Sequence, residues 1–421
     1  MFKLNLKWQD YLYTFFMVGA AILGMLKLTI YAKQLDIEDF GLYSLVLSGY
    51  LFIMYAGSFG LNEALVKEGA IAYGKGDFKH IKKMRDLALF YSSLGVFSIS
   101  FIVFLFAQFL LEESVRDVIF LMIVLAITTL EFNLVSSYVR VNHKFTLFAK
   151  MLFFKSLIVI ILAWYIAPVF GVYGVVFLES IVFIVLVIYV LGIEKFNINF
   201  QQAFIARSLF KKAMRQGMPV MASTVIRNLA LSLDRWVIVA TLGLMAVAKY
   251  AFAMILYQVA MVGIGFISTI LGTRWLSSFG ANSDLENMFL KIKKIGFLIV
   301  SVSVIFAWPF LEALVYLVIQ YYPQYADEEV YLTIKLIYIG VVFLTITYLL
   351  DWLFIASSKE RILLNLSIIS LLLTFVLMSY GYFSKIEVYE YAMIFLLVRG
   401  FNFLICLFVI SRYLRLRLVS L

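Results

Sequence analysis

The chain has 421 residues, of which 64% are hydrophobic and 14% are charged, and its formal net charge is +10. Soluble globular domains are about half apolar and about a quarter charged, so this composition excludes an ordinary soluble protein. Most of the chain must face lipid or other helices, and the remaining connections are too short to form a soluble catalytic domain.

Twelve apolar runs are each long enough to cross a bilayer as a helix, which needs about 20 residues. In chain order, the predicted spans are 11–32, 42–61, 87–111, 118–138, 151–168, 173–191, 217–242, 250–271, 295–316, 332–356, 363–383 and 391–411. The first run is too long for a signal-peptide core, so we expect it to remain as a membrane helix. The pattern therefore predicts an all-α polytopic membrane protein.

Basic residues are concentrated in alternate connections between these spans. Residues 67–85, 195–215 and 412–417 each carry several lysines or arginines, whereas the intervening connections are short and acidic. Positive charge close to the ends of spans marks the cytoplasmic side. We therefore expect both termini to be cytoplasmic. The net positive charge is a topology signal, and no nucleic-acid partner is predicted.

The spans divide into two groups of six. An offset of 207 residues places Tyr43 on Tyr250 and Lys67 on Arg274, at comparable points relative to the spans. Because six is even, the two lobes would share one orientation and be related by a pseudo-two-fold axis along the membrane normal. We predict an N-terminal lobe over residues 1–200, a cytoplasmic connector over 201–216 and a C-terminal lobe over 217–421.

The connector has the pattern of an amphipathic helix. Basic residues occupy one side of its helical wheel and apolar residues the other; the basic ones are Arg207, Lys211, Lys212 and Arg215. A helix of this kind lies on the cytoplasmic membrane surface. It either straps the two bundles together or additionally binds anionic lipid.

Two arginines fall near the middle of predicted spans, where a charge is costly unless it faces a cavity or a partner. Asn228 neighbours Arg227, and Asn402 follows Arg399 on the same helical face. The planar fork of arginine suits two phosphate oxygens, so these four residues are candidate ligands of a diphosphate in a central cavity. The alternative is that a carboxylate neutralises each arginine, with Asp234 as the candidate partner of Arg227.

Further ionisable residues inside the spans are candidates for gating or ion coupling. They are Lys27, Asp234, Arg235, Glu131, Glu179 and Asp351. Lys27 and Asp234 match under the 207-residue offset and form a candidate ion pair between the two halves. The carboxylates of Glu131, Glu179 and Asp351 are candidates to bind or relay H⁺ or Na⁺, or else make structural helix contacts.

Other charged residues lie close to span ends, where a long side chain can snorkel to the membrane surface. We expect Lys155 to snorkel towards the cytoplasm, and Lys335 and Glu312 to snorkel outwards.

The sequence carries no signature of covalent chemistry. No P-loop, G-x-S-x-G, H-E-x-x-H or dinucleotide fingerprint occurs, so no catalytic residue and no cofactor are predicted. The single cysteine, Cys406, and two distant histidines, His80 and His143, predict neither an intrachain disulfide nor a metal centre.

At two places the sequence resembles the polysaccharide repeat-unit flippases of the multidrug/oligosaccharidyl-lipid/polysaccharide exporter superfamily. The first is YAKQLDIEDFGLYSLVLSGYLFIMYAGSFGLNEALVKEGA, over residues 31–70, with Phe40-Gly41-Leu42-Tyr43 after the first span and Gly60 after the second. The second is Gly217-Met218-Pro219, followed by LDRWVIVATLG at 233–243 and by Lys249-Tyr250.

This resemblance implies a two-lobed, MATE-like, V-shaped bundle that works by alternating access. It implies a substrate of undecaprenyl-diphosphate-linked oligosaccharide, turned from the cytoplasmic to the outer leaflet of a bacterial inner membrane for O-antigen, capsule or exopolysaccharide assembly. A monomer is expected, with a polysaccharide polymerase and a chain-length regulator as candidate partners. Energy would come from an H⁺ or Na⁺ gradient or from downstream consumption of the product.

Two other functions are compatible with the pattern. A multidrug cation antiporter would share the fold but favour an acidic cavity. A membrane-embedded polymerase or glycosyltransferase would need a sizeable outer loop, and the longest predicted outer connection, 317–331, is short.

Overall fold

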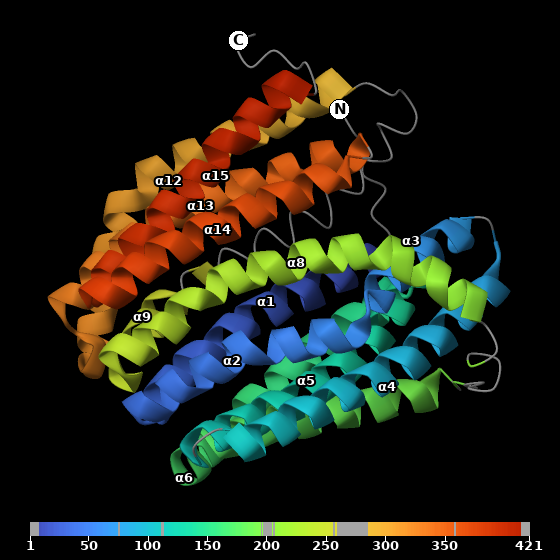
Figure 1. Cartoon of the computed structure of the whole chain (residues 1–421), viewed down its shortest axis with the longest axis horizontal. Coiled ribbons are helices and arrows are strands. Elements are labelled where there is room, and N and C mark those ends of the chain that lie inside the picture. The colour runs from blue at the N-terminus through green and yellow to red at the C-terminus, as the bar shows by residue number, and fades with distance from the viewer. Residues whose placement is uncertain are drawn as a thin grey trace. The chain divides into compact units, whose positions relative to one another are not determined.

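The computed structural model describes residues 8–74, 76–110, 113–194, 196, 204, 207–255, 257–258, 285–357 and 359–413 (Figure 1). Almost all of these residues are helical. The helices are α1 (Trp8–Gln34), α2 (Ile37–Ser58), α3 (Leu61–Gly74), α4 (Phe78–Leu110), α5 (Glu113–Val141), α6 (Phe145–Ile193), α8 (Arg207–Leu242), α9 (Leu244–Ala253), α12 (Leu285–Tyr321), α13 (Glu328–Ala356), α14 (Glu360–Ser384) and α15 (Val388–Tyr413), with a short 3-10 turn at Pro323–Tyr325.

Eight helices within the described residues are long and apolar enough to cross a membrane. One of them, α6, has 49 residues and covers both the fifth and the sixth predicted spans. The seventh and ninth predicted spans lie within α8 and α12, and most of the eighth, 250–271, falls outside the described residues. The prediction of an all-α polytopic membrane protein is confirmed.

A sharp break at Gly171 separates the two halves of α6. Gly171 has a φ of 56° and a ψ of −147°, a conformation that glycine adopts without the steric cost of a side chain. The amide N–H of Val172 donates to Oδ2 of Asp39, in the first turn of α2, over 3.1 Å. A Cβ atom at position 171 would stand 2.2 Å from the same oxygen. The second half of α6 is therefore hydrogen-bonded at its start to the first turn of α2.

Helices α2 and α4 approach each other closely because both carry glycine at the crossing. A Cβ atom on Gly57 would lie 2.5 Å from Cα of Val96, and one on Gly95 would lie 2.3 Å from the carbonyl oxygen of Gly57. The absence of a side chain at these two glycines therefore lets the two helices pack closely. After α2, the chain turns at Phe59 and Gly60, both with positive φ, into α3, a separate helix in what was predicted to be a cytoplasmic connection.

The chain forms two compact units, Met1–Asn228 (the N-terminal unit) and Leu229–Leu421 (the C-terminal unit). The division falls inside α8 rather than in the predicted connector 201–216. Helix α8 begins at Arg207 and continues past Pro219 to Leu242. Residues 207–216 of the predicted connector and the seventh predicted span therefore form one helix. The lobe boundaries at 200 and 217 remain a prediction.

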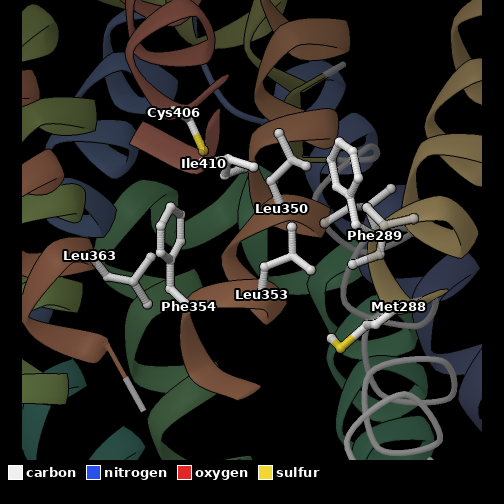
Figure 2. Packing of buried hydrophobic residues seen from close by; sticks show 10 residues of the cluster. Met288, Phe289, Leu350, Leu353, Phe354, Leu363, Cys406 and Ile410 are labelled. Atoms are coloured by element: carbon white, nitrogen blue, oxygen red, sulfur yellow. The ribbon is translucent and has the colours of Figure 1, made fainter. Parts of the chain in front are cut away.

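Within the N-terminal unit, α5 packs against α2, α4 and α6, and α1 packs mainly against α6. Within the C-terminal unit, α13 packs against α9, α12 and α15. Figure 2 shows an apolar core of the C-terminal unit, where Met288 and Phe289 of α12 meet Leu353 of α13. Cys406 of α15 is a buried member of the same cluster.

Candidate functional site

The N-terminal unit buries a carboxylate that is bonded by three donors. Glu179 of α6 is 3% exposed, and its Oε1 atom accepts from Lys27 Nζ at 3.0 Å, Tyr31 Oη at 2.9 Å and Tyr43 Oη at 2.7 Å. The two tyrosine rings stand edge to face, with centroids 4.9 Å apart. Lys27 also donates to Tyr43 Oη over 3.2 Å. Helices α1, α2 and α6 thus converge on one oxygen atom.

A second ammonium group belongs to this Glu179 cluster. Lys155, in the first half of α6, holds Nζ 5.3 Å from the ring centroids of both Phe132 and Phe183, which stack on each other. Lys155 lies within electrostatic range of Lys27 and Glu179. The prediction that Lys155 snorkels to the cytoplasm is therefore wrong, because two aromatic faces hold the ammonium inside the bundle.

The C-terminal unit has a comparable group, the Asp234 cluster, with the charges differently placed. Asp234 of α8 is 2% exposed and accepts from Tyr250 Oη of α9 at 2.6 Å and from the Arg235 amide at 2.7 Å. Arg399 of α15, 3% exposed, packs its guanidinium over the Phe395 ring at 5.1 Å. Both arginines interact electrostatically with Asp234.

The two arginines of this cluster retain donor capacity. The Nε atoms of Arg235 and Arg399 are buried and have no hydrogen-bond acceptor among the described residues. Buried polar groups normally have a partner, so each such atom calls for an explanation. Two guanidinium groups beside one carboxylate leave an excess of positive charge in an apolar bundle. The cluster can therefore accept an anionic group.

The structure distributes the predicted diphosphate ligands between the two units. Arg227 and Asn228 are half-buried at the end of the N-terminal unit, whereas Arg399 and Asn402 lie on α15 in the C-terminal unit. The amide of Asn402 donates to Ser370 Oγ of α14 over 2.7 Å, so part of its hydrogen-bonding capacity joins two helices. A common cavity for these four residues remains a prediction.

The predicted ion pair between Lys27 and Asp234 also stays a prediction. Each residue has a partner within its own unit, Glu179 for Lys27 and Tyr250 for Asp234. The observed pairing of Lys27 was missed because Glu179 follows it by 152 residues, and no spacing rule connects positions so distant.

Two further coupling candidates, Glu131 and Asp351, lie on α5 and α13. Glu131 of α5 accepts from Ser93 Oγ of α4 at 2.5 Å, and Asp351 is buried on α13. Among the described residues, no group of three or more metal-ligating side chains occurs.

The basic side of the predicted connector is exposed at the start of α8. Lys211, Lys212 and Arg215 face outwards, while the side chain of Arg207 lies outside the described residues. Lys212 stands 3.7 Å from Glu68 of α3, and Phe210 stacks on Tyr91 of α4 with centroids 4.2 Å apart. This segment is thus attached to the N-terminal unit, and its predicted contact with lipid remains untested.

The fold is that of a multi-pass, all-helical membrane protein with two buried charge clusters. A family profile described as "Polysaccharide biosynthesis protein" matches residues 8–275. The chain belongs to this polysaccharide biosynthesis protein family, and the resemblance inferred from the sequence is confirmed. Among curated proteins, none matches the chain.

Solved structures share the fold at low sequence identity. A lipid II flippase MurJ in an inward closed conformation is 13% identical, with a TM-score of 0.70, over 95% of this chain and 87% of its own. A multidrug resistance MATE family transporter of the MOP superfamily, inward-facing, is 15% identical, with a TM-score of 0.64, over 99% and 97%. A MATE structure in complex with Br-NRF is 16% identical, with a TM-score of 0.62, over 96% and 95%.

Proposed function

We propose that the protein is a transporter that moves a polyprenyl-diphosphate-linked oligosaccharide repeat unit from the cytoplasmic to the outer leaflet by alternating access. The observation that carries the proposal is the excess positive charge of the Asp234 cluster, in which Arg235 and Arg399 share one carboxylate. A substrate phosphate would supply the missing negative charge and accept from the free Nε atoms. Membership of the polysaccharide biosynthesis family supports an oligosaccharide as the group attached to that phosphate.

In this proposal the polyprenyl tail stays in the bilayer while the diphosphate and sugars enter the protein. Arg227 and Asn228 would contribute from the N-terminal unit, and Arg399 and Asn402 from the C-terminal unit. We further propose a monomer in the bacterial cytoplasmic membrane with both termini inside, serving O-antigen, capsule or exopolysaccharide assembly. A polymerase and a chain-length regulator would use the product. The energy would come from an H⁺ or Na⁺ gradient or from consumption of the product by these partners. The chain itself would carry out no enzymatic step.

The test is translocation of a diphosphate-linked polyprenyl oligosaccharide in proteoliposomes, scored by exposure of the sugar to an impermeant lectin. Arg399→Ala is compared with Arg412→Ala, because Arg412 on the same helix also covers a phenylalanine four residues earlier but is exposed. We expect Arg399→Ala to abolish flipping and Arg412→Ala to preserve it. Flipping that survives Arg399→Ala, Arg235→Ala and Arg227→Ala would retain the function but refute this site.

The same preparation separates the flippase from its main alternative. If wild-type protein flips no lipid-linked oligosaccharide under either an H⁺ or a Na⁺ gradient, efflux of a cationic dye is measured. Gradient-driven dye efflux without lipid flipping would replace our proposal with a multidrug antiporter.

A further inference from the structure

Glu179 has one oxygen atom that is fully bonded and one that is not. All three of its hydrogen bonds, from Lys27, Tyr31 and Tyr43, end on Oε1. Its other oxygen, Oε2, accepts no hydrogen bond from the described part of the chain. A carboxylate has about four acceptor positions on its two oxygens. The carboxylate of Glu179 can therefore accept a further hydrogen bond through Oε2 and keep its three existing ones.

The ammonium group of Lys155, in the same Glu179 cluster, has no hydrogen-bond acceptor among the described residues. Its Nζ forms no hydrogen bond or ion pair with any described residue and is held only by the faces of Phe132 and Phe183. Phe183 follows Glu179 by four residues on α6, and residues at this spacing are neighbours on one helical face. The ammonium of Lys155 is thus held one helical turn from a carboxylate that it does not bind.

The two lysines are attached to Glu179 through different parts of the fold. Lys27 belongs to α1, which packs mainly against α6 and only slightly against α2. Lys155 and Glu179 belong to the two halves of α6, which are joined by the turn at Gly171. A shift of α1 would remove Lys27 together with Tyr31, whereas Lys155 would stay beside Glu179. Glu179 would then keep only its hydrogen bond from Tyr43. The cost of leaving this buried carboxylate without a counter-ion would oppose the shift of α1.

We propose that Lys155 is the second counter-ion of Glu179, which replaces Lys27 when α1 leaves its present position. The carboxylate is then paired in both arrangements, first by an ammonium on α1 and then by one on α6. Lys155 is a positioning residue in this scheme, since it acts through Glu179. The pairing rests on the geometry of the Glu179 cluster alone. Its use during the movement of α1 rests on the transport function proposed above.

A double-mutant cycle in detergent-solubilised full-length protein tests the pairing without any substrate. Thermal unfolding is measured for wild type, Lys27→Met, Lys155→Met and the double variant, and for the same set with Glu179→Gln. Lys335→Met is the matched control, because Lys335 also lies in a spanning helix but is exposed. We expect the double variant to lose more Tm than the two single variants together, since only it leaves Glu179 without an ammonium.

In the Glu179→Gln background, we expect the lysine substitutions to change the Tm in the opposite direction. Without the carboxylate, each lysine is an unpaired charge inside the bundle, so replacing it with methionine should raise the Tm. Should the double variant fail to fold, the triple variant with Glu179→Gln is expected to restore folding. Additive losses of Tm, equal effects of Lys155→Met in both backgrounds, or a triple variant that does not fold would each overturn the proposal.

The flipping assay adds a measurement that a merely structural lysine would not affect. We expect Lys155→Met to lower the maximal rate of flipping without changing the substrate concentration that gives half of it, and Lys155→Arg, which retains the charge, to restore the rate. A changed half-saturating concentration would show that Lys155 contacts substrate instead and would contradict its positioning role. If wild type shows no flipping, the proposed function fails while the double-mutant cycle still decides the pairing.

Discussion

Tyr43 and Tyr250, which are 207 residues apart, each donate their hydroxyl to a buried carboxylate at nearly the same distance. The bond from Tyr43 to Glu179 measures 2.7 Å, and the bond from Tyr250 to Asp234 measures 2.6 Å. Both carboxylates lie beside two cationic side chains, Lys27 and Lys155 in one unit and Arg235 and Arg399 in the other. The two units therefore share one polar arrangement, although the carboxylate comes from the last span of the first group of six and the first span of the second.

Removing either tyrosine hydroxyl should destabilise the protein. Tyr43→Phe and Tyr250→Phe preserve the ring but delete a hydrogen bond to a charged group, which is worth about 1.5–3 kcal/mol. Denaturant or thermal unfolding in detergent should show this loss for both variants. Tyr380→Phe, at an exposed tyrosine of α14, is the control and should unfold like wild type. Equal stability of all three variants would mean that these hydroxyls do not support the carboxylates.

The turn inside α6 should not tolerate a side chain. Gly171→Ala places a Cβ atom against Asp39 and forces an alanine into a positive-φ conformation that is essentially restricted to glycine, which alone costs about 1–3 kcal/mol. We expect a lower Tm and a lower yield of folded protein. Gly192→Ala is the matched control on the same helix, because a Cβ atom there meets nothing within 4 Å. A Gly171→Ala variant as stable as Gly192→Ala would show that the turn is not constrained in this way.

Stability should fall at acidic pH because of a salt bridge on the predicted outer face. Lys249 donates to Asp327 over 2.5 Å, and this hydrogen bond, with another from the Glu329 amide, holds the pKa of Asp327 below its ordinary value of 3.8. A lowered pKa in the folded state gives stability that is present above pH 3.8 and is lost as the pH falls through the folded value.

The pH dependence of Tm tests this salt bridge. Asp327→Asn should have a lower Tm than wild type at pH 6, and the difference should shrink as the pH falls below 3.8 and through the lowered pKa of Asp327 in the folded protein. Because the side chain of Asp327 is 42% exposed, we expect a small effect that weakens further in high salt. A difference between the two proteins that stays constant across this pH range would exclude titration of Asp327 as its cause.

Orientation can be measured with single introduced cysteines, since the one native cysteine is fully buried. Lys79 and Ser384 are both exposed and lie in connections predicted to be cytoplasmic and external, respectively. An impermeant maleimide added to intact spheroplasts should label Ser384→Cys but not Lys79→Cys, and permeabilisation should make Lys79→Cys reactive. The opposite pattern would invert the predicted topology.

The amino-acid sequence by itself determined the class of protein, the approximate positions of its helices and its family. These follow from long apolar runs and from short motifs, which act locally and are readable along the chain. The mid-span position of Arg399 already marked it as a residue that needs a partner or a ligand, and the 207-residue offset already matched Tyr43 with Tyr250.

Only the tertiary structure decided which buried charges meet. Lys155 was expected to reach the membrane surface because distance to a span end is all that the sequence measures. Its actual position depends on Phe132 and Phe183, which come from other parts of the bundle. The bond between Lys27 and Glu179 likewise depends on packing between α1 and the second half of α6. In an apolar bundle, each charge must find its partner on whichever helix packs beside it, and that neighbour is set by packing rather than by sequence spacing.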